Sequence, residues 1–96
     1  MSTAAREEAL RLVREGWALH YEGDAPDPDL ALLDGDRLYA AGLEKLAGTG
    51  DLEAIAALAD LISDCARAAA EERPDATAAA WRDTARSLGV TRFTAS

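Results

Sequence analysis

Apolar and polar residues recur along the first twenty positions with the period of an α-helix. The apolar side of this segment contains Ala9, Leu10, Leu12, Val13 and Trp17. Charged residues occupy the opposite side, where Glu7 and Arg11 stand four residues apart and belong to a solvated, ion-paired surface. Ser2 or Thr3 can cap the start of the helix. The pattern therefore predicts a helix over about residues 3–21.

Glycine, proline and capping residues divide the rest of the chain into three further helices. Asp27 is a natural N-cap, and Pro28 suits the first helical position, where its missing N–H is not needed. A glycine-rich turn ends that helix, and Asp51 and Asp75 are the expected caps of the next two. The predicted helices span about residues 28–47, 51–73 and 75–88, followed by a tail at 90–96.

Composition restricts the fold to helices. Of the 96 residues 47 are apolar, and 23 of these are alanine, whereas only two valines and two isoleucines are present. Sheets need β-branched and aromatic side chains to fill their pleated faces, so this chain cannot build one. The length is sufficient for one small domain. We predict a single all-α domain over residues 1–96, a small bundle of about four helices.

The second predicted helix carries two glycines on its apolar face. Gly35 and Gly42 stand seven residues apart, near the middle of that face. A glycine inside a helix costs about 1 kcal/mol relative to alanine. Close approach of another helix would offset this cost, and we predict such packing here. The alternative is a kinked or weak helix.

The third predicted helix has a wide apolar surface, because its charged residues crowd into a narrow arc. A surface helix usually has an apolar stripe a little over about 100° wide, and this helix can bury about twice that. It is either the central helix of the bundle or a helix that also faces another subunit, and we favour the second interpretation. The predicted interface comprises Leu32, Gly35, Leu38, Tyr39, Gly42, Leu46, Ile55, Leu58, Leu61, Ile62 and Cys65.

Charge and hydropathy exclude several classes of partner. The chain has 18 acidic and 10 basic residues and a net charge of −8, which disfavours nucleic acids and anionic membrane surfaces. No apolar run approaches the ~20 residues that span a bilayer. Residues 6–8 are charged, where a signal peptide would need an apolar segment. We expect a cytoplasmic protein without membrane insertion. One cysteine and one histidine form no zinc-binding spacing, so we expect no metal and no cofactor.

Each candidate for chemistry also has a structural interpretation, which we favour. Asp24, Asp27 and Asp29 offer oxygens suited to a hard cation, but their order differs from that of an EF-hand loop. We interpret them as a solvated loop that ends in a helix cap. His20, near a helix C-terminus, and Cys65 lack a nucleophile or base at a recognisable spacing and are interpreted as packing residues. We predict no catalytic residue.

Residues 32–47 read Leu-Leu-Asp-Gly-Asp-Arg-Leu-Tyr-Ala-Ala-Gly-Leu-Glu-Lys-Leu-Ala, and an alanine-rich helix follows after a short turn. This part of the chain, about residues 29–73, resembles the trans-isoprenyl diphosphate synthases, whose corresponding helix contains Leu-Leu-x-Gly-Asp-x-Leu-Tyr-x-x-Ala. The matching residues are Gly35, Asp36, Leu38 and Tyr39. The resemblance implies an isoprenoid-synthase-like helical hairpin at the centre of the bundle, with the matched helices packing across a subunit interface.

The residues that this family uses for catalysis are not matched. Its prenyl transfer needs two aspartate-rich motifs that hold Mg²⁺ and the allylic diphosphate. Where the first motif is expected, this chain has Tyr21-Glu22-Gly23-Asp24 instead of paired aspartates, and the second would lie beyond residue 96. The resemblance therefore implies a truncated and catalytically degenerate relative.

Together these features predict a non-catalytic helical interaction protein. It would be a small accessory or structural subunit that forms homo- or hetero-oligomers, binding itself or a larger enzyme or complex through the second and third helices. Two alternatives stay open. One is a regulatory small subunit of a heteromeric prenyl diphosphate synthase, and the other is a bundle that binds a lipid-like ligand among its helices.

Overall fold

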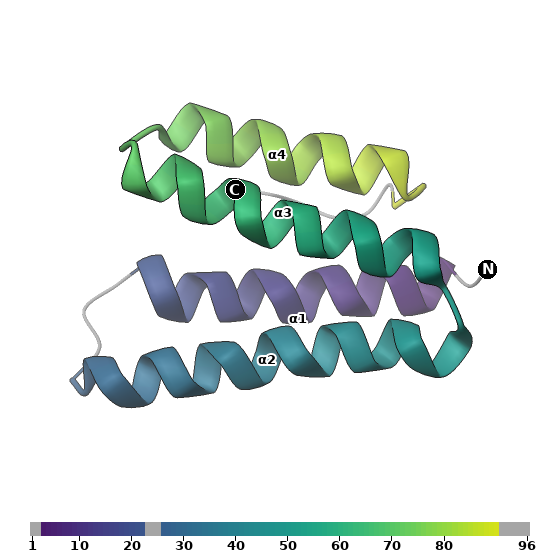
Figure 1. Cartoon of the computed structure of the whole chain (residues 1–96), viewed down its shortest axis with the longest axis horizontal. Coiled ribbons are helices and arrows are strands. Elements are labelled where there is room, and N and C mark those ends of the chain that lie inside the picture. Colours follow the sequence, from purple (N-terminus) through teal and green to yellow (C-terminus); the bar gives the residue numbers. More distant parts are fainter. Residues whose placement is uncertain (1–2, 23–25, 91–96) are drawn as a thin grey trace.

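A computed structural model describes residues 3–22 and 26–90 of the chain. The elements in this part of the chain are helices, and the predicted all-α bundle of about four helices is confirmed (Figure 1). Their bounds are α1 (Thr3–Tyr21), α2 (Pro28–Thr49), α3 (Leu52–Ala70) and α4 (Pro74–Ser87). The predicted cap Ser2 and the tail beyond Val90 lie outside the described residues. The isoprenoid-synthase-like character of the hairpin stays a prediction.

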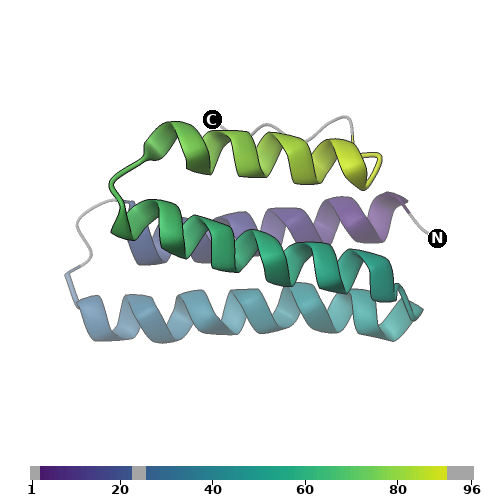
Figure 2. The same ribbon diagram turned by 45° about the horizontal axis from the view of Figure 1, so that its top comes forward.

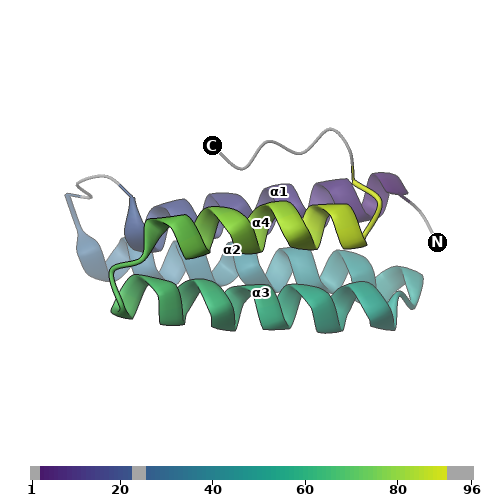
Figure 3. The same ribbon diagram turned by 90° about the horizontal axis from the view of Figure 1, so that it is seen from above.

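The four helices pack as two antiparallel pairs. α1 lies against α2, and α4 lies against α3, as two views of the bundle show (Figures 1 and 2). Seen from above, the pairs form two layers, with α3 and α4 in front of α1 and α2 (Figure 3). α3 contacts all three other helices. Its buried residues, Ala54, Leu58, Leu61, Cys65 and Ala68, are covered by the other helices of the same chain. Other apolar residues of α3 are exposed, among them Leu52, Ala59 and Ala66, so a second subunit at this face stays a prediction.

α2 and α3 are capped at their N-termini by the side chains that the sequence predicts, Asp27 and Asp51. The Asp27 carboxylate accepts a hydrogen bond from the backbone N–H of Leu30 at 3.2 Å. Asp51 likewise accepts from the N–H of Ala54 at 3.2 Å. Each carboxylate satisfies one of the backbone donors that lack a partner in the first turn of a helix.

The turn between α3 and α4 differs from the prediction. α3 ends at Ala70 rather than near residue 73, because Glu72 adopts a left-handed backbone conformation with φ 55°. The N–H of Arg73 then donates to the carbonyl oxygen of Ala68 at 2.9 Å and closes the turn. α4 begins at Pro74, so Asp75 lies in its first turn and is not the N-cap. Proline takes the first helical position because no N–H is needed there.

The core lies between the two helix pairs. Its largest fully buried side chains come from all four helices, and Trp81 of α4 is the largest of them. The other large apolar ones are Leu10, Val13, Leu46, Leu58 and Leu61. Burying a leucine-sized side chain contributes about 1.5–3 kcal/mol, so this cluster provides most of the drive for folding.

Three glycines mark the crossing of α1 and α2. A Cβ atom on Gly16 would lie 2.7 Å from the carbonyl oxygen of Gly35, and one on Gly35 would lie 2.9 Å from the carbonyl oxygen of Gly16 and collide with the ring of His20. A Cβ on Gly42 would lie 2.9 Å from Val13 Cγ2. The close packing predicted for Gly35 and Gly42 is confirmed, and the approaching helix is α1 of the same chain.

Candidate interaction surface

The structure distributes the predicted interface residues between the core and the surface. Six are buried inside the bundle, namely Gly35, Gly42, Leu46, Leu58, Leu61 and Cys65. Four are half-buried, namely Leu38, Tyr39, Ile55 and Ile62. Leu32 is 50% exposed.

The six buried residues do not form a surface of the folded bundle. They face neighbouring helices of their own chain, so a partner cannot reach them while the bundle keeps this fold. Periodicity identified correctly that these positions are apolar contacts, but it does not tell an intramolecular neighbour from an intermolecular one. The two glycines in particular serve the α1–α2 crossing. A protein-binding surface has to be sought among the exposed apolar residues.

His20 packs between α1 and α2, as a structural residue. Its Nε2 lies 3.0 Å from the carbonyl oxygen of Leu32, which can only accept, and 3.3 Å from Asp36 Oδ1. Its ring meets that of Tyr39 edge-on, with centroids 5.0 Å apart. Burial raises the pKa of the Tyr39 phenol, so this hydroxyl stays protonated at neutral pH. The cluster fixes the end of α1 against α2 and contains no adjacent nucleophile.

Cys65 lies in the core and is 1% exposed. Burial raises the pKa of its thiol from 9.0 to about 11, because the thiolate loses its hydration there. The thiolate is the reactive form of cysteine, so this side chain is a poor nucleophile.

We expect Cys65 to react slowly with a thiol reagent such as 5,5′-dithiobis(2-nitrobenzoic acid). At pH 8 a thiol with a pKa of about 11 has about a hundredfold less thiolate than one with a pKa of 9.0, and burial also keeps the reagent away from the sulfur. The native rate should therefore lie at least about a hundredfold below the rate in denaturant at the same pH. Equal rates in the two conditions would show that the thiol is exposed.

A nearly buried ion pair joins three distant parts of the chain. Arg6 Nε donates to Asp51 Oδ2 at 2.7 Å and Nη2 donates to Oδ1 at 3.0 Å, while Nη1 donates to the carbonyl oxygen of Leu88 at 3.1 Å. Asp51 is 1% exposed. The hydrogen bonds from Arg6 hold the pKa of the Asp51 carboxyl below its usual range, against the opposing effect of burial. The sequence gives no sign of this pair, because its members are 45 positions apart.

Exposed leucines gather at one end of the bundle. Among the described residues, six large apolar side chains are exposed, and five of them lie between positions 19 and 33. They come from the last turn of α1 and the first turns of α2, which are neighbours in space (Figure 1). We call this part of the bundle the α1–α2 end and define it by Leu19, Tyr21, Leu30, Leu32 and Leu33. These side chains surround the end rather than share one face, because residues two apart on a helix, such as Leu30 and Leu32, point to nearly opposite sides. The sixth, Leu52, lies at the opposite end and is 75% exposed.

The exposure of leucines on α2 differs along the helix. The N-terminal turns of α2 extend past the end of α3 in two views of the bundle (Figures 1 and 3). Leu32 and Leu46 lie on the same side of α2, yet Leu46 is fully buried and Leu32 is half-exposed. The apolar period of α2 therefore continues into N-terminal turns that the rest of the bundle covers only in part.

The sequence at the α1–α2 end is strongly acidic. Residues 22–36 contain six aspartate or glutamate residues and no lysine or arginine. Two of these carboxylates pair with arginines outside the segment, Glu22 with Arg14 at 2.6 Å and Asp34 with Arg37 at 3.2 Å. Of the other described acidic residues in this segment, Asp27 caps α2 and Asp36 lies 3.3 Å from His20 Nε2. Acidic residues thus outnumber basic ones at this end of the bundle.

Comparison with protein-family models, with curated proteins and with solved structures finds no match for this chain. The resemblance to trans-isoprenyl diphosphate synthases therefore stays a prediction. Among residues 3–22 and 26–90, no helix is long and apolar enough to cross a membrane. Within the same residues, no three His, Cys, Asp or Glu side chains are grouped to hold a metal ion. Asp24, one of the loop carboxylates considered for a cation, lies outside them.

Proposed function

We propose that this protein is a non-catalytic helical interaction protein that binds a larger partner protein through the α1–α2 end. The observation that carries the proposal is the gathering there of five of the six exposed large apolar side chains of the described residues. Single exposed apolar residues are ordinary on protein surfaces, but a group of them bordered by polar residues is typical of an interaction site.

The charge around the α1–α2 end specifies the chemistry of the partner. The carboxylates of residues 22–36 attract a surface with lysine or arginine around an apolar centre, since complementary charges speed association and select the partner. A second copy of this chain would instead bring two sets of carboxylates together. The proposed assembly is therefore a hetero-oligomer, in which the leucines enter an apolar surface rimmed by basic residues.

Replacing Leu30 and Leu33 with glutamine tests this proposal. Glutamine has nearly the helix propensity of leucine, and both leucines are about half-exposed, so we expect each change to cost no more than about 0.5 kcal/mol in stability. The matched control is Leu52→Gln, which alters an exposed leucine at the opposite end. Thermal unfolding followed by circular dichroism confirms that all three chains are folded.

Binding is then compared by capturing proteins from the native host on immobilised wild type, Leu30→Gln/Leu33→Gln and Leu52→Gln. We expect a partner that the wild type and Leu52→Gln retain and the double variant binds at least about tenfold more weakly. Its binding should also weaken as salt rises, because the charges of residues 22–36 are screened. The proposal is wrong if the double variant retains the same proteins as the wild type, or if the wild type retains none.

A further inference from the structure

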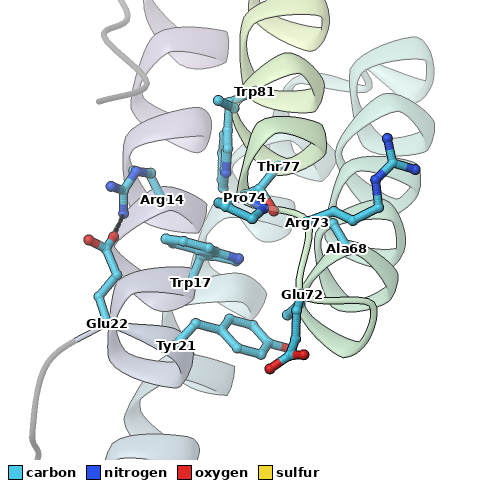
Figure 4. A pocket seen from close by; sticks show the side chains of 12 residues that line it. Arg14, Trp17, Tyr21, Glu22, Ala68, Glu72, Arg73, Pro74, Thr77 and Trp81 are labelled. Atoms are coloured by element: carbon cyan, nitrogen blue, oxygen red, sulfur yellow. Dashed lines mark ion pairs between the residues drawn. The ribbon is translucent and has the colours of Figure 1, made fainter.

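A cavity of about 530 Å³ lies between the C-terminal half of α1 and the turn that joins α3 to α4 (Figure 4). Its volume falls within the range typical of small-molecule sites, about 300–1,000 Å³. Only Tyr21 is shared with the α1–α2 end. The cavity is thus a second candidate site with its own residues.

Aromatic and small side chains shape this cavity. Trp17, Tyr21 and Trp81 form one side, with ring centroids 5.6 Å apart for Trp17 and Tyr21 and 6.4 Å apart for Trp17 and Trp81. Ala69 and Ala78 line it from α3 and α4. Because alanine does not reach across the space between three helices, room is left against the rings. A mostly apolar molecule of modest size suits such walls.

Trp17 also presents a hydrogen-bond donor without a partner. Its Nε1 is buried and has no hydrogen-bond partner among the described residues. Figure 4 shows the nitrogen-bearing edge of the indole directed toward the α3–α4 turn, between Tyr21 and Pro74. An indole N–H can only donate, and a buried donor without an acceptor is unfavourable. A ligand acceptor at this edge would remove that cost.

The charges that line the cavity balance one another. Arg14 and Glu22 form an ion pair at 2.6 Å, and the guanidinium of Arg14 lies 4.9 Å from the centre of the Trp17 ring. Glu72 and Arg73 are neighbours at the turn. This lining favours neither an anion nor a cation. A diphosphate in particular would need several cations, and the two arginines here stand beside two carboxylates.

We propose that this cavity binds a small, neutral, mostly apolar molecule with a single carbonyl-type oxygen, which accepts a hydrogen bond from Trp17 Nε1–H. The aromatic side chains contact the apolar body of the ligand. The proposal does not depend on Leu30 or Leu33, so its failure would leave the proposed protein-binding function untouched.

Acetophenone and ethylbenzene are suitable probes, because they have similar shapes and only the ketone has an acceptor. The indole N–H resonances of the ¹⁵N-labelled protein report binding, and the Trp17→Phe variant identifies which resonance belongs to Trp17. We expect acetophenone to shift the Trp17 indole proton downfield in a saturable manner. Ethylbenzene should bind without this downfield shift.

Two variants complete the test. Trp17→Phe keeps an aromatic side chain but removes the hydrogen-bond donor. It should therefore lower the binding affinity for acetophenone about tenfold more than the affinity for ethylbenzene. Ala78→Leu, at an exposed position of α4, fills the cavity and should abolish binding of both probes while the helix content is retained. The proposal is overturned if acetophenone leaves the Trp17 resonance unshifted, if Trp17→Phe weakens both probes equally, or if Ala78→Leu binds as the wild type does.

Discussion

Gly16→Ala should lower the free energy of unfolding by about 2 kcal/mol or more, although alanine is the better helix former. The added Cβ would lie 2.7 Å from the carbonyl oxygen of Gly35 and 2.8 Å from Tyr39 Cδ1. The oxygen belongs to the backbone of α2 and cannot rotate away. The change is therefore expected to push α1 and α2 apart along their whole contact.

Gly48→Ala is the matched control, because a Cβ at this position of α2 would meet nothing within 4 Å. It should leave the stability unchanged or raise it by up to about 1 kcal/mol. Urea unfolding followed by circular dichroism measures both variants. If Gly16→Ala proved as stable as Gly48→Ala, the two helices would not cross as closely as the structure shows.

Asp51→Asn should lower the melting temperature at pH 7 by about 10 °C or more. The amide can still cap α3, but it cannot neutralise Arg6, whose guanidinium is held in a nearly buried position beside Leu88. Removing one member of a buried ion pair lowers the stability by more than the pair contributes, because the other charge then stays buried without a partner. Asp34→Asn is the control, because it removes an exposed partner of Arg37 and should have little effect.

The same ion pair gives the stability a dependence on pH. The pKa of Asp51 is lower in the folded chain than in the unfolded chain, owing chiefly to the hydrogen bonds from Arg6. Its contribution is therefore fully present above the unfolded pKa of about 4 and is lost as the pH falls through the folded value. Melting temperatures measured from pH 7 down to pH 2 should fall less steeply for Asp51→Asn than for the wild type. Parallel curves would show that Asp51 is not paired in solution.

The helices could be predicted from the sequence because their signals are local. Asp27 and Pro28 mark the start of α2, and the spacing of apolar residues identifies α1 through a single repeated period. The sequence predicts the end of α3 near residue 73, because Pro74 is the visible stop signal, whereas the helix ends at Ala70. The turn closes two residues before Pro74, at Glu72, whose left-handed conformation no composition rule indicates.

The packing partners could not be predicted, because they are contacts between residues far apart in the sequence. Gly35 and Gly42 indicate close packing because they are two glycines on one apolar face. Their counterpart on α1 is Gly16, and a single glycine in a helix does not by itself predict close packing. Arg6 meets Asp51 only after three helices have assembled. Leu32 follows the same apolar period as Leu46, yet Leu32 is 50% exposed and Leu46 is fully buried. The surface open to a partner thus differs from the apolar face that the sequence indicates.

Site-specific cross-linking tests the proposed interaction surface most directly. A photoreactive phenylalanine derivative replaces Leu33 in one chain and Leu52 in another, and both chains are irradiated in extracts of the native host. The proposed function requires a cross-link from position 33 to one partner protein, at a segment with lysine or arginine beside apolar residues, and none to that protein from position 52. Equal labelling from both positions, or no labelling from position 33, would contradict it.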